Sequence, residues 1–188
     1  MTQPAPINTQ DTASQNTISL DNLSPNRLSQ ANAFDFLMGT WDVYHRRLSD
    51  RLIGSDTWQE FGGHMTARPI LGGPDNMGGN MDDNVLDLPD DPHRAISLRT
   101  YDPASDKWAI WWLDGRNPHS LDVPVLGQFK GSIGEFYAED ILNNKPIKVR
   151  FRWTGTDTPT PRWEQAFSPD NGTTWEVNWT MDFTKNRD

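Results

Sequence analysis

The sequence predicts an all-β fold, an antiparallel up-and-down barrel of about 8–10 strands. After Gly39, short runs rich in β-branched and aromatic residues alternate with clusters of Gly, Pro, Asp and Asn, without a long helical pattern. Several connections also carry defined turn chemistry, such as Pro103 in DPASD and Asn143-Asn144 in NNK. Closing into a barrel removes exposed sheet edges, which favours the barrel over the alternative, a β-sandwich.

Three segments are predicted along the 188 residues. Residues 1–23 lack aromatic side chains and are rich in Thr, Gln, Asn, Ser and Pro, which predicts a disordered tail. Residues 24–38 predict a short helix, since Ser24 can cap it and Pro25 suits its first position. Residues 39–185 predict one barrel domain. Its expected strands are 41–50, 56–68, 82–87, 94–102, 107–114, 122–130, 133–142, 146–154, 161–168 and 174–184.

The composition excludes several classes of function. With 26 Asp+Glu against 17 Lys+Arg, the chain would be repelled by nucleic acid and by an anionic membrane, so neither is expected as a partner. Cysteine is absent, which excludes disulfides, a thiol nucleophile and a thiolate metal site. The first thirty residues have no basic start and no continuous apolar run, so we expect no signal peptide, no membrane anchor and a cytoplasmic protein.

The stretch FDFLMGTWDVYHRRL contains Gly39-Thr40-Trp41, the Gly-x-Trp that opens the first strand of lipocalins and other calycins. Together with SLRTYDP, W-x-IWWLDGR and PRWEQAFSPDNGTTWEVNW, it makes residues 34–184 resemble an uncharacterised bacterial family of lipocalin-like proteins. The resemblance implies a cup-shaped barrel that holds a small, mostly apolar molecule, and it implies no reaction. It also implies a basic residue stacked on Trp41, for which Lys185 and Arg187 are the candidates.

No cofactor or metal is expected. The haem-binding nitrobindins share the Gly-x-Trp start but ligate iron through a late histidine, whereas the last histidine here is His119. The histidines form no His-x-x-x-His or Glu-x-x-His pair, so zinc has no local signature, and His93 and His119 are expected in loops. Residues 72–92 are rich in Gly and Asp but lack the EF-hand spacing, which predicts a solvated rim loop that could gate a cavity.

Alternation of apolar and polar residues predicts a lumen lined by aromatic side chains. Phe151 and Trp153 share the apolar face of strand 146–154, and Trp175, Trp179 and Phe183 share that of strand 174–184. On strand 107–114 both faces are apolar: Trp108, Ile110 and Trp112 lie on one and Trp111 and Leu113 on the other. Such an outer face needs a cover, either the N-terminal segment or a second subunit, so we expect a homodimer.

Ten residues form the candidate ligand-binding set. His45 shares a strand face with Trp41, which predicts a hydrogen-bonded histidine in the lumen wall rather than a catalytic base. Surface salt bridges are the favoured interpretation for the charges of Glu60, Arg99 and Glu164; if some of them point inward instead, Arg99 with Glu60 or Glu164 would anchor an anion or a hydroxyl of the ligand. The full set is Trp41, His45, Trp58, Glu60, Arg99, Trp112, Phe151, Trp163, Glu164 and Trp179.

The stretch SPDNGTTW, residues 168–175, matches the Asp-box of sialidases and other β-propellers. Propellers repeat this motif from blade to blade, but here it occurs once and the chain has no internal repeat. The motif therefore predicts the last hairpin of the barrel, with Trp175 packed into the core.

The function these patterns favour is binding of a small hydrophobic or aromatic molecule in the barrel cavity. One alternative is a lipocalin-fold enzyme, such as a cyclase, isomerase or hydratase, which would require a His or Glu deep in the cavity with a perturbed pKa. The other alternative is carbohydrate binding, which would require exposed Trp side chains on a shallow groove. No nucleophile motif marks an enzyme, and turnover stays an open question.

Overall fold

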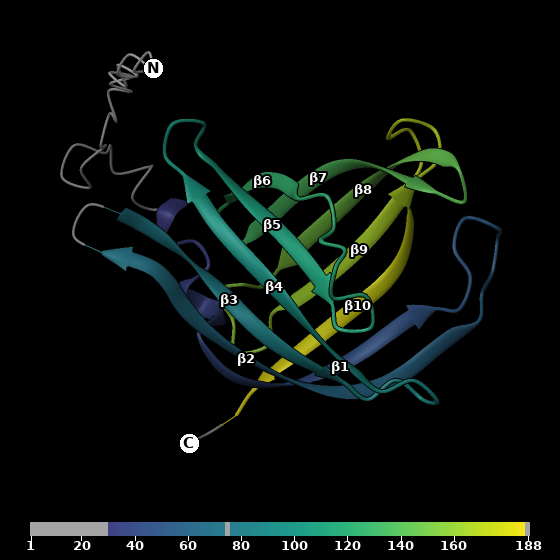
Figure 1. Cartoon of the computed structure of the whole chain (residues 1–188), viewed down its shortest axis with the longest axis horizontal. Coiled ribbons are helices and arrows are strands. Elements are labelled where there is room, and N and C mark those ends of the chain that lie inside the picture. Colours follow the sequence, from purple (N-terminus) through teal and green to yellow (C-terminus); the bar gives the residue numbers. More distant parts are fainter. Residues whose placement is uncertain (1–29, 74–75, 187–188) are drawn as a thin grey trace, which may run out of the picture.

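Ten antiparallel strands close into a single barrel in the computed structural model, which describes residues 30–73 and 76–186 (Figure 1). Each strand pairs with the next along the chain, and β1 pairs with β10 to complete the sheet. This confirms the predicted all-β barrel. The strands are β1 (Gly39–Leu48), β2 (Trp58–Gly73), β3 (Asn76–Leu86), β4 (His93–Asp102), β5 (Lys107–Asp114), β6 (Val125–Lys130), β7 (Ile133–Leu142), β8 (Lys145–Thr154), β9 (Arg162–Ser168) and β10 (Glu176–Lys185).

The segment before β1 contains less helix than predicted. The expected tail, 1–23, and the first part of the expected helix, 24–29, lie outside the described residues. Residues 30–31 are helical, a turn follows, and η2 (Asp35–Leu37) is a single 3-10 turn. Phe34 and Leu37 are both fully buried, and a 3-10 turn brings side chains three residues apart to the same side.

The segment around η2 closes one end of the barrel (Figure 1). The ring of Phe34 packs edge-on against the rings of Trp108 and Phe129, each at a centroid distance of 4.9 Å. The indole nitrogen of Trp41 donates a hydrogen bond to the backbone oxygen of Leu37, at 2.7 Å. These contacts fix the segment to the first strand and make it part of the core.

The basic residue that stacks on Trp41 is Lys185. Trp41 and Lys185 are register partners in the β1–β10 pair, and the Lys185 Nζ lies 5.3 Å from the centroid of the Trp41 ring. The other candidate, Arg187, lies outside the described residues. The stacking of a basic residue on Trp41, which the resemblance implied, is therefore present.

The predicted turn chemistry is confirmed at both sites. Between β4 and β5, the Asp102 carboxylate accepts hydrogen bonds from the backbone nitrogens of Ala104 and Ser105, at 2.9 and 3.2 Å. Between β7 and β8, Asn143 and Asn144 have φ angles of 51° and 60°, the left-handed pair that a two-residue hairpin requires.

The predicted rim loop at 72–92 is wrong for most of its length, because β2 and β3 form a long hairpin through it. Gly79, which suggested a loop, lies inside β3, where a Cβ would come within 2.1 Å of the Arg99 backbone oxygen. Glycine here permits a close approach of β4 rather than a flexible connection. Asp82 and Asn84 of the same segment point into the barrel and are buried.

The Asp-box stretch forms the β9–β10 hairpin, as predicted. The Asp170 carboxylate accepts hydrogen bonds from the Ser168 hydroxyl, the Thr174 backbone nitrogen and the Thr174 hydroxyl, at 2.8, 2.8 and 2.6 Å. These bonds, those of Thr174 foremost, lower the pKa of Asp170 to about 2. The motif therefore acts as a hydrogen-bonded turn.

Trp175 does not enter the core, contrary to the prediction. A register shift between Val177 and Trp179 interrupts the alternation of β10. As a result Trp179 points inward, whereas the Trp175 ring packs beside Tyr137 and under the Arg150 guanidinium, which is 4.9 Å from the ring centroid.

Candidate functional site

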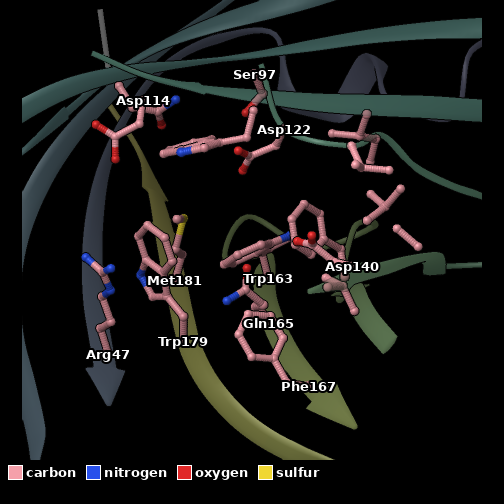
Figure 2. Close-up of a pocket in the computed structure, with 18 of the residues that line it drawn as sticks. Arg47, Ser97, Asp114, Asp122, Asp140, Trp163, Gln165, Phe167, Trp179 and Met181 are labelled. Carbon is pink, nitrogen blue, oxygen red and sulfur yellow. The ribbon is translucent and has the colours of Figure 1, made fainter. Parts of the chain in front are cut away.

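The barrel encloses a cavity of about 470 Å³ that is open at the end opposite η2. Figure 2 shows part of its lining. Its lining comes from the inward faces of most strands and from the segments that follow β1 and β5. The lining has three parts: an aromatic wall, a buried polar cluster and a charged mouth.

The aromatic wall consists of Trp112, Phe151, Trp163 and Trp179. The ring of Trp179 meets those of Trp112 and Trp163 edge-on, at centroid distances of 5.9 and 5.7 Å. Phe151 extends this array through its edge-on contact with Trp163, at 4.9 Å. Packed aromatic rings resist collapse into the cavity and offer flat apolar surfaces to a ligand.

The polar cluster consists of Asp82, Asn84, Ser97 and Arg99, on the facing strands β3 and β4. Arg99 Nη1 lies 2.5 Å from an Asp82 carboxylate oxygen, and the two side chains are 5% and 1% exposed. The other Asp82 oxygen accepts hydrogen bonds from the amide of Asn84 and from the backbone nitrogen of Ser97. Within the described residues, Arg99 Nε is buried and has no hydrogen-bond partner. The cluster is thus a buried ion pair with an unused donor.

Both signs of charge surround the mouth. Arg47 and Arg51 line it on the β1 side, and Figure 2 shows Arg47 beside Trp179. Asp114, Asp122 and Asp140 line it from β5, the segment before β6, and β7. Asp114 is paired with Arg116, whereas burial, followed by the charges of Asp140 and Asp114, raises the pKa of Asp122. We name these two groups the mouth arginines and the mouth aspartates.

His45 lies behind the aromatic wall and does not line the cavity. Its Nδ1 accepts a hydrogen bond from the Trp179 indole nitrogen, at 3.2 Å, and its ring stacks on Phe61 at a centroid distance of 4.6 Å. Burial, and next the charges of Arg47 and His93, lower the pKa of His45 to about 3. A neutral imidazole in this place holds Trp179 in position.

Acidification should therefore destabilise the barrel through His45. A histidine in the unfolded chain titrates near its ordinary pKa of about 6.5, so below that pH the unfolded chain binds a proton that the folded chain excludes until about pH 3. Stability should fall between these values with a contribution of up to ~1.4 kcal/mol per pH unit. Urea unfolding from pH 7 to pH 4 should show a shallower decline for His45→Gln than for the wild type. The exposed His119 supplies the control, His119→Gln, and equal slopes for His45→Gln and the wild type would contradict the assignment.

The structure brings half of the sequence-predicted site residues together. Arg99, Trp112, Phe151, Trp163 and Trp179 line the cavity. Trp41 and His45 point inward but are covered by other core residues.

Trp58, Glu60 and Glu164 lie on the outer face of the barrel. Glu60 accepts hydrogen bonds from Tyr44 and Arg46 there, and Glu164 is paired with Arg150, so for both the surface salt bridge is the observed arrangement. Glu60 directly precedes the inward Phe61, and Glu164 directly follows the inward Trp163, so alternation turns both carboxylates outward. The favoured surface salt bridges are therefore present for Glu60 and Glu164 but not for Arg99, and the alternative pairing of Arg99 with either glutamate is wrong, because its partner is the buried Asp82.

Sequence reasoning missed Asp82 and the mouth arginines. The alternation Asn80, Asp82, Asn84, Leu86 was a usable signal, because it marks one polar strand face that ends in an apolar residue. Because the segment is also rich in glycine, it was predicted as a loop and this alternation was not used. For Arg51, which follows β1, no strand pattern exists to assign a direction.

The described histidines and carboxylates do not assemble into a metal site, since no group of at least three such residues is placed to hold an ion. His93 is not a loop residue as expected: it begins β4, and its Nε2 lies 4.0 Å from an Asp114 carboxylate oxygen. His119 lies in an exposed turn, which confirms its prediction. In the same described part of the chain, no helix has the length and hydropathy of a membrane span.

Neither a protein-family model nor a curated protein matches the chain. Solved structures do match it, among them the S-type phycobiliprotein lyase CPES from Guillardia theta, with a TM-score of 0.51 and 8% sequence identity. The match covers 82% of this chain and 91% of that chain. At this identity the likeness concerns the fold alone, a lipocalin-like antiparallel barrel.

Proposed function

We propose that this barrel binds a small, mostly apolar or aromatic molecule in its cavity. The observation that carries the proposal is the open cavity of about 470 Å³ with four Trp side chains in its lining. Ligand sites typically occupy about 300–1,000 Å³ and combine apolar walls with a few fixed polar groups. Both properties are present here in one space.

The aromatic wall and the polar cluster have separate roles in this proposal. Trp112, Trp163 and Trp179 supply affinity through apolar contact. Arg99 supplies orientation, since a hydroxyl or carbonyl oxygen of the ligand can accept a hydrogen bond from its unpartnered Nε. Asp82 holds the Arg99 side chain in the required direction.

The structural neighbour supports binding but does not decide the chemistry. It is named as a lyase for phycobiliproteins, and it shares this fold, which is consistent with a ligand held inside the barrel. A lyase or another enzyme on this barrel would need a proton-transfer group in contact with the ligand. No described His or Glu lines the cavity, and of the four aspartates that do, Asp82 and Asp114 are paired with Arg99 and Arg116. His45 is occupied by Trp179, so acid/base catalysis would depend on Asp122 and Asp140 at the mouth, and the apolar lining favours binding as the first proposal. The Trp rings that line the cavity lie in the interior rather than on a shallow groove, so this site does not favour carbohydrate binding.

The test is a fluorescence titration with N-phenyl-1-naphthylamine, an uncharged aromatic probe. Saturable binding to the wild type is expected. Ala138→Trp should weaken it by about tenfold or more, because the indole fills part of the space beside the aromatic wall. Gln128→Trp adds the same ring on the exposed face of β6 and should leave binding unchanged. No saturable binding, or equal binding by both variants, would contradict the proposal.

We also propose a homodimer formed through the outer faces of β4 and β5. Leu98 pairs with Trp111 and Ile96 pairs with Leu113, so four apolar side chains lie together on the outside, each only half-buried. Analytical ultracentrifugation that gives the monomer mass at micromolar concentration would refute this state.

The cytoplasm is the proposed location, which cell fractionation checks.

A further inference from the structure

The mouth arginines differ from the other two arginines that line the cavity, Arg99 and Arg116, because neither forms a salt bridge with a carboxylate. Within the described residues, no salt bridge involves Arg47 or Arg51. The carboxylate near Arg51, that of Glu176, instead accepts a hydrogen bond from the Leu52 backbone nitrogen, at 2.8 Å. Arg116 already pairs with Asp91 and Asp114.

Both guanidinium groups are held at the edge of the aromatic wall. The Arg47 Cζ lies 4.9 Å from the centroid of the Trp179 ring, and the Arg51 Cζ lies 5.4 Å from that of the Phe167 ring. Both side chains are half-buried and both line the cavity. Stacking on aromatic faces fixes each planar group while leaving its N–H donors free.

The positive charge on this side of the mouth is only partly compensated by nearby carboxylates. Burial, and next the neighbouring Arg47, lowers the pKa of Arg51 to about 10; burial, and next Arg116, lowers the pKa of Arg47. Both groups remain protonated at neutral pH, and the charges of Asp114 and Asp91 near Arg47 and of Glu176 near Arg51 offset the cost of burial only in part. An anion placed between them would relieve this cost.

The opposite side of the mouth directs an anion toward the arginines. Asp122 and Asp140 form no salt bridge with any cation among the described residues, so their negative charges repel an anion on that side. The net charge of −9 also opposes anion binding elsewhere on the chain. The field across the mouth therefore gives an acidic ligand one preferred orientation.

We infer that the ligand of this cavity is an apolar molecule with a single acidic group, such as a carboxylate, which Arg47 and Arg51 bind at the mouth while the apolar body contacts Trp112, Trp163 and Trp179. This inference rests on the proposed binding function and narrows its ligand class. Stacked arginines present paired donors that match the geometry of a carboxylate.

The test compares three probes with one apolar body by isothermal titration calorimetry: 2-naphthoic acid, 2-naphthylmethanol and 2-naphthylmethylamine. The acid should bind about tenfold or more tightly than the alcohol, and its affinity should fall with added salt while that of the alcohol does not. Arg47→Gln and Arg51→Gln should each lower the affinity for the acid by about tenfold and the affinity for the alcohol by less than about twofold. Arg46→Gln is the matched control, because Arg46 neighbours Arg47 in sequence but pairs with Glu60 on the outer face.

Each result decides for or against the inference. Equal affinity for acid and alcohol, or equal losses of both in the arginine variants, would overturn it while leaving the binding function intact. Tightest binding of the amine would overturn it as well and assign the charged contact to the mouth aspartates. If neither these probes nor N-phenyl-1-naphthylamine binds, the proposed function itself has failed, and the inference fails with it.

Discussion

Asp82→Asn should lower the free energy of unfolding by about 3–5 kcal/mol, the usual cost of removing one partner from a buried ion pair. Arg99 is 5% exposed on its side chain and would keep its charge inside the barrel without a counter-ion. The Asn80 side-chain oxygen, which accepts a hydrogen bond from Arg99 Nη1 at 3.1 Å, is neutral and cannot replace the carboxylate. Urea unfolding followed by tryptophan fluorescence measures the effect.

Asp83 supplies a matched control for this prediction, since it is the next residue in the chain and carries the same charge. Its carboxylate pairs with Arg94 on the exposed face of β3, where an ion pair contributes about 0–1 kcal/mol. Asp83→Asn should therefore cost less than about 1 kcal/mol. Similar losses for the two variants would contradict the description of the polar cluster as a buried ion pair.

Phe34→Ala should lower the free energy of unfolding by about 3–5 kcal/mol, although residue 34 precedes the first strand. Its ring is fully buried at the closed end of the barrel, edge-on to Trp108 and Phe129, and lies 5.2 Å below the Arg99 guanidinium. Removing it leaves a cavity lined by rigid aromatic rings, which cannot collapse to fill the space. Thermal and urea unfolding measure the loss.

Phe36 provides the comparison for Phe34. It packs against Trp153 at a centroid distance of 5.4 Å but is only partly buried, so Phe36→Ala should cost about half as much or less. If the two variants lose the same free energy of unfolding, or if Phe34→Ala loses almost none, the segment before β1 is not part of the core.

The barrel was predictable because local rules and tertiary structure agree along most of the chain. Turn residues such as Asn143-Asn144 adopt the backbone angles that their chemistry favours, and β5, β7 and β8 begin and end within a residue of their predicted bounds. The β2–β3 hairpin was missed because glycine and aspartate usually indicate loops. Here Gly79 permits close strand packing and Asp82 is retained by Arg99, two tertiary reasons that a local pattern does not contain.

The aromatic half of the site was predictable and the charged half was not. Period-2 alternation turns Trp112, Phe151 and Trp163 inward, and their size guarantees that they fill the lumen. Charged residues follow their partners instead, so Arg99 points inward because Asp82 faces it from β3. Trp175 shows the same limit for an apolar residue, because a bulge in β10 changes its face.

The most direct measurement is a crystal structure of the complex with N-phenyl-1-naphthylamine. We expect the probe to lie inside the barrel, with its rings against Trp112, Trp163 and Trp179. A probe bound instead in the outer groove beside Tyr137 and Trp175, with the barrel interior filled by rearranged side chains, would contradict it.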